Sequence, residues 1–64
     1  MLIRKHYHGE PSAVYDVTFA SLDEVKQAYT KHGESEGWID SFIAILKQQK
    51  KASDRFAEYT IESE

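Results

Sequence analysis

Two helices that follow each other almost without a loop occupy the middle of this chain, and they limit what the rest can form. Ser21-Leu22-Asp23-Glu24 has the pattern of a capping box, in which the Ser21 hydroxyl and the Glu24 carboxylate each accept a backbone amide proton. Gly33 is suited to end this helix in the left-handed region, and Ser35 caps a second helix directly afterwards. So short a connection predicts an antiparallel helix pair.

The second helix carries a wider apolar surface than the first. Its apolar residues are Trp38, Ile39, Phe42, Ile43, Ile45 and Leu46. They cover an arc of about 160° by the 3.6-residue period, whereas burying one face takes only about 100°. Contact with both a sheet and the first helix would explain the excess. The alternative is that one edge, with Trp38 and Ile45, stays free for a partner, since Trp is enriched among interface anchors.

Strand patterns flank the helix pair. Residues 2–8 are rich in β-branched and aromatic side chains, residues 9–12 have turn composition, and residues 13–19 alternate in polarity. After the helices, Ser53-Asp54 predicts a turn into a last strand, in which Ala57, Tyr59 and Ile61 share one face.

These elements predict one small α+β domain over residues 1–64, in the order β-β-α-α-β. Its three-stranded, mainly antiparallel sheet would carry the antiparallel helix pair on one face, because one layer of helices is all that so short a chain can build. Residues 62–64 are expected to form a frayed acidic tail.

The register of the first hairpin follows from which side chains are buried. Placing Arg4 opposite Asp16 puts Ile3 opposite Val17 and makes one face nearly all apolar. A one-residue slip would bury Arg4 and His6 without partners, at a cost of about 1–3 kcal/mol per group. The helices should then shield Tyr15, Val17, Tyr59 and Ile61. The bare face would carry Leu2, Arg4, His6, His8, Val14, Asp16, Thr18, Phe56, Glu58 and Thr60.

Charge and composition narrow the class of partner. The net charge is −3, and the only basic cluster is Lys47, Lys50 and Lys51. Nucleic-acid binders normally show a basic footprint, so nucleic acid is disfavoured and these lysines form an alternative site. No apolar run is long enough to span a membrane, and the N-terminus lacks the order of a signal peptide. We therefore expect a cytoplasmic protein without membrane contact.

Motifs for catalysis and metal binding are not found. The chain has no cysteine, no glycine-rich phosphate loop and no nucleophile elbow. A domain this small is also expected to lack room for a ligand pocket of about 300 Å³ or more. His6 and His8 point the same way near Asp16, but a structural zinc site takes four ligands. We predict no enzyme activity, no metal and no cofactor.

Three functions remain open. The first is a protein-binding module, either an adaptor or an inhibitor of a cellular protein. Small proteins of this kind are expected among those that phages and other mobile elements encode. Its contact residues would be Trp38, Ile45, Phe56, Val14 and Leu2. The second is a nucleic-acid-associated protein that uses the three lysines. The third is a self-associating subunit, such as a homodimer, that pairs through open sheet edges and the bare face.

Overall fold

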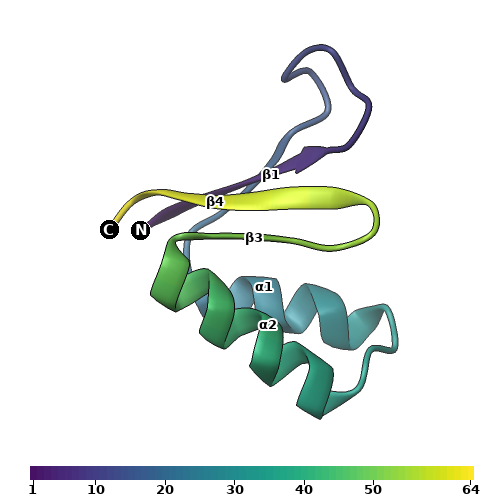
Figure 1. The fold of residues 1–64 in the computed structure, drawn as a ribbon, viewed down its shortest axis with the longest axis vertical. Helices are drawn as coiled ribbons and strands as arrows, with labels where there is room; N and C mark the ends of the chain where they lie inside the picture. Colours follow the sequence, from purple (N-terminus) through teal and green to yellow (C-terminus); the bar gives the residue numbers. More distant parts are fainter.

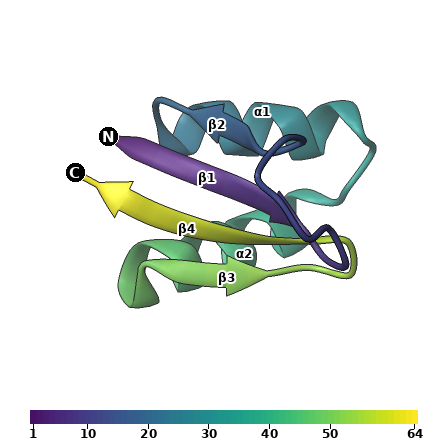
Figure 2. The same ribbon diagram turned by 90° about the horizontal axis from the view of Figure 1, so that it is seen from above.

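A computed structural model describes residues 1–64 and shows two helices packed on one face of a four-stranded antiparallel sheet (Figure 1). The strands are β1 (Leu2–Tyr7), β2 (Val17–Phe19), β3 (Lys51–Ser53) and β4 (Ala57–Ser63), and the helices are α1 (Leu22–Lys31) and α2 (Glu36–Gln49). The sheet order is β2-β1-β4-β3. Seen from above, α1 lies beneath the β2 side of the sheet and α2 beneath the β3 side (Figure 2). The predicted α+β fold with its helix pair on one face is confirmed.

The short strand β3 is the one element that the sequence analysis missed. The predicted order β-β-α-α-β has no strand between the second helix and the turn at Ser53-Asp54. Instead α2 is capped by Lys50 in the left-handed region, at φ 64°, and β3 starts at the next residue. Glycine is the usual residue in that conformation, so a lysine there gives no signal that the helix stops.

The register of β1 with β2 differs from the predicted one by two residues. Arg4 lies opposite Thr18 instead of Asp16, and Ile3 lies opposite Phe19. A shift by an even number of residues keeps every side chain on its face, which is why the predicted inside and outside positions of β1 survive it. The predicted strand over residues 13–19 is wrong in its first half, because only Val17–Phe19 pair with β1.

The core lies between the helices and the inner face of strands β1, β4 and β3. Its nine buried residues are Ile3, Val25, Tyr29, Ile39, Phe42, Leu46, Ala52, Ala57 and Tyr59. As predicted, Tyr59 is buried, and Ile61 packs partly buried against the core. The prediction is wrong for Tyr15, which is 63% exposed in the loop before β2. It is also wrong for Val17, which is exposed at the edge of the sheet.

Both predicted helix starts are confirmed. The Ser21 hydroxyl accepts from the Glu24 amide at 3.2 Å, and the Glu24 carboxylate accepts from the Ser21 amide, which completes the capping box. The Ser35 hydroxyl accepts from the Trp38 amide at 3.3 Å. The Ser21 cap therefore fixes where α1 begins, and the Ser35 cap fixes where α2 begins.

The burial of α2 gives a paired test of the fold. Leu46→Ala should lower the free energy of unfolding by about 2–5 kcal/mol, because it leaves a cavity in the core, where Leu46 is fully buried. Ile45→Ala shortens a side chain that is 45% exposed, and it should cost less than about 1 kcal/mol. Urea denaturation followed by circular dichroism measures both. Equal losses would contradict this orientation of α2.

Candidate functional site

A pocket of about 780 Å³, open to solvent, is lined by residues from the end of β1, the α1–α2 connection and the β3–β4 turn. Four of its lining residues are aromatic or apolar: Tyr7, Tyr29, Trp38 and Phe56. The expectation that the chain is too small for a pocket of this size is wrong.

The Trp38 ring forms a wall of the pocket and is held by other rings. Trp38 stacks on Phe42 at a centroid separation of 5.3 Å, and it meets Tyr29 edge to face at 5.0 Å. Tyr29 and Phe42 are buried, whereas Trp38 remains 38% exposed. Rings at these separations attract each other and restrict motion. Trp38 is therefore a preorganised apolar surface facing solvent.

The β3–β4 turn is fixed by Asp54, which places Phe56 at the pocket. One Asp54 carboxylate oxygen accepts from the Phe56 and Ala57 amides, both at 2.7 Å. The other accepts from the Tyr29 hydroxyl at 2.5 Å. These bonds tie the turn to α1, and they leave the Phe56 side chain 68% exposed.

The Tyr29–Asp54 pair has shifted ionisation. Burial, and then the hydrogen bond to Asp54, raise the pKa of Tyr29 far above its ordinary value. Burial acts to raise the pKa of Asp54 as well, but the hydrogen bonds from Tyr29 and the two amides outweigh it and hold this pKa below its ordinary value. Near neutral pH Tyr29 thus stays protonated and Asp54 stays ionised.

The charged side chains of the pocket balance one another. Lys5 and Arg55 carry positive charge, and Glu34 and Asp54 carry negative charge. The Lys5 ammonium lies 4.8 Å from the centroid of the Tyr7 ring, where a cation is attracted by the ring face. Among these four side chains there is no excess of either sign.

The five partner-contact residues predicted from the sequence fall in different places. The structure brings Trp38 and Phe56 together in the pocket. Ile45 is exposed further along α2, Val14 is 77% exposed in the loop between β1 and β2, and Leu2 is half-buried in β1. The sequence analysis predicted the turn at Asp54 but missed its bond to Tyr29, since these residues are far apart in the chain.

The lysine cluster predicted as an alternative nucleic-acid site is partly neutralised. Lys50 pairs with the Glu64 carboxylate, and the Lys51 ammonium lies 3.8 Å from a carboxylate oxygen of Glu58. Lys47 lies in the last turn of α2. Two of the three lysines therefore form ion pairs with neighbouring carboxylates, and less positive charge remains to attract phosphate.

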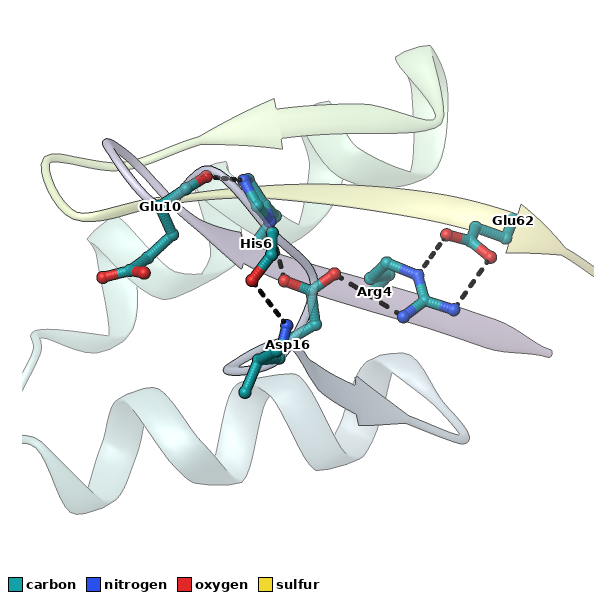
Figure 3. A network of polar contacts seen from close by, with 7 residues as sticks. Arg4, His6, Glu10, Asp16 and Glu62 are labelled. Carbon is teal, nitrogen blue, oxygen red and sulfur yellow. Dashed lines mark hydrogen bonds and ion pairs between the residues drawn. The ribbon is translucent and has the colours of Figure 1, made fainter.

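The two histidines predicted to point the same way do not converge on one point. His6 Nδ1 lies 2.7 Å from an Asp16 carboxylate oxygen, whereas His8 Nε2 lies 3.2 Å from the Asp54 carbonyl oxygen (Figure 3 shows the His6 contacts). No three His, Cys, Asp or Glu side chains are grouped so that they could hold a metal ion.

Comparison with known proteins adds no assignment. No protein-family model matches the chain, and neither a curated protein nor a solved structure matches it significantly. Neither helix has the length and apolar character needed to cross a membrane. The functional argument therefore depends on the geometry of the site.

Replacing Tyr29 by Phe tests the bond that fixes the pocket. It should raise the pKa of Asp54 and lower the free energy of unfolding at pH 7 by about 1.5–3 kcal/mol, the usual worth of a hydrogen bond to a charged group. Because folding depresses this pKa, the Asp54 contribution is complete above its ordinary value of 3.8 and is lost as pH falls through the folded-state pKa. The Tyr29→Phe variant should therefore lose less stability on acidification than the unmodified chain does.

Tyr15→Phe is the matched control, because it removes the same hydroxyl from a residue that is mostly exposed. Carboxyl NMR shifts report the Asp54 titration, and urea denaturation at several pH values reports stability. Equal behaviour of the two variants would show that the Tyr29–Asp54 bond contributes nothing.

Proposed function

We propose that this chain is a non-enzymatic protein-binding module, an adaptor or inhibitor, whose pocket receives a large apolar side chain from a partner protein. The observation that carries the proposal is the meeting of Trp38 and Phe56, from different elements, at one solvent-open pocket. Exposed aromatic residues with a packed backing are the usual anchors of protein interfaces.

Rigidity of the pocket supports this function. The Trp38 ring is held by Tyr29 and Phe42, and the Phe56 backbone is held by Asp54. Because these groups are ordered before a partner arrives, little conformational entropy is lost at the interface on binding. The balanced charges at the rim favour an apolar or aromatic guest over a strongly charged one.

Acid–base chemistry has less support at this site. A general acid or base works best with a pKa near the operating pH. The shifts in Tyr29 and Asp54 move both groups away from neutrality. Nucleic-acid binding through Lys47, Lys50 and Lys51, and self-association, stay predictions without a comparable observation in their favour.

Selection from a random-peptide phage library on the immobilised full chain tests the proposal. Trp38 is the only tryptophan, so its fluorescence reports directly whether a selected peptide occupies the pocket. We expect enriched peptides to share a large apolar residue and to change the Trp38 emission. Phe56→Ala should raise their Kd at least about tenfold, or 1.4 kcal/mol.

Ile45→Ala is the matched control, because it truncates another exposed apolar residue outside the pocket lining. It should leave the Kd of the selected peptides unchanged. Peptides that bind equally well to Phe56→Ala, or that leave the Trp38 emission unaltered, would place the binding surface elsewhere and overturn the proposal.

A further inference from the structure

The loop of residues 8–16 extends from the sheet on the side away from the helices (Figure 1). Near its end it exposes two large apolar side chains, Val14 at 77% and Tyr15 at 63%. Its backbone hydrogen bonds are few: His8 N to Phe56 O at 2.9 Å and Glu10 N to Tyr7 O at 3.3 Å at its start, and Asp16 N to Ala13 O at 3.1 Å at its end. The shape of the loop therefore depends on side-chain contacts.

The His6 imidazole supplies those contacts by bridging the two ends of the loop (Figure 3). Its Nδ1 lies 2.7 Å from a carboxylate oxygen of Asp16, and its Nε2 lies 3.1 Å from the carbonyl oxygen of Glu10. An ionised carboxylate and a carbonyl only accept hydrogen bonds. Both ring nitrogens must therefore donate, and only the imidazolium form carries a proton on each.

We propose that His6 is a proton-operated clamp, which holds the loop of residues 8–16 closed when doubly protonated and releases its Glu10 end when it loses a proton. A neutral imidazole has one N–H, and the charge-assisted bond to Asp16 retains it. The Nε2 lone pair then faces the Glu10 carbonyl oxygen, and the two repel. The imidazole then holds the loop at Asp16 alone, so the segment between Glu10 and Asp16, which carries Val14 and Tyr15, gains freedom of movement when His6 loses a proton.

The charges around His6 come from every element beside it. Asp16 and Glu10 belong to the loop, and Glu58 lies opposite His6 on β4, where it pairs with Lys51 of β3. Asp16 and Glu10 favour the imidazolium. Arg4, also on β1, acts against the imidazolium, because its guanidinium lies 3.6 Å from the Asp16 carboxylate and brings a second positive charge to it. The same guanidinium is paired with Glu62 of β4 at 2.5 Å.

His8 is also on this stretch of chain, and its ring contacts the Asp54 carbonyl oxygen instead.

The hydrogen bond to Asp16 is the main reason why the pKa of His6 is raised above its ordinary value. Asp16 is well placed to do so, since its side chain is 5% exposed and the ring is its close partner.

The sign of the pH dependence follows from that direction. Because the pKa of His6 is higher in the folded chain, the clamp is fully formed below the ordinary value of 6.5 and is lost as pH rises through the folded-state pKa. The loop is thus closed in mildly acidic solution and open on the alkaline side.

NMR of the full chain between about pH 5 and pH 9 tests the clamp, with His6 ring shifts as the titration and backbone order parameters as the loop readout. We expect a His6 pKa above 6.5. Order parameters of residues 11–15 should fall from about 0.85 toward 0.6 with the same midpoint. A loop that stays rigid while His6 titrates would overturn the proposal.

Three variants separate the clamp from a merely structural histidine. Asp16→Asn should lower the His6 pKa and move the loop midpoint by the same amount. His6→Gln should abolish the pH dependence of the loop, because the amide carries no titrating proton. His8→Gln is the matched control and should leave the transition unchanged. The assignment to His6 would be contradicted if the pH midpoint of the loop transition stayed the same in Asp16→Asn. It would also be contradicted if the transition disappeared in His8→Gln.

Discussion

The packing of Tyr29 holds the parts of this small domain together. Its ring meets Trp38, Phe42 and Tyr59 at centroid separations of 5.0, 5.1 and 5.7 Å, which joins both helices to the central strand β4. Its hydroxyl donates to Asp54 and fixes the β3–β4 turn. A core of nine residues buries little apolar area. A side chain of α1 that contacts α2, β4 and the β3–β4 turn therefore contributes a large share of the stability of the domain. The candidate pocket exists because the same residue backs one wall and anchors the opposite rim.

The open face of the sheet is polar, and its charges are satisfied within the chain. Arg4 pairs with Glu62 and Asp16, and Lys51 pairs with Glu58. Such exposed pairs add little to stability, but they cover the sheet with groups that disfavour a dry interface. The most exposed large apolar side chains lie beyond the ends of the strands: Phe56 at the pocket, and Val14 and Tyr15 in the loop of residues 8–16.

Some features of the fold were readable from sequence because they are local. The caps at Ser21 and Ser35 and the alternation of Ala57, Tyr59 and Ile61 each depend on neighbours a few residues away. The strand β3 was missed because Lys50 ends α2 in the left-handed region, a conformation that a lysine in the sequence does not predict. The hairpin register was two residues off because both registers bury the same face of β1, and pattern alone does not separate them.

For the site, the sequence by itself offered Trp38 and Phe56 as two of five candidate contact residues on separate elements. That they share a pocket was decided by the tertiary structure, since the turn at Asp54 is set by a hydrogen bond from Tyr29, 25 residues earlier in the chain. The same holds for His6: its position on the outer face follows from strand alternation, but its two acceptors are placed by the path of the loop. Side-chain type and periodicity are local properties of a chain, whereas a pocket or a clamp is defined by distances between distant residues, which only folding sets.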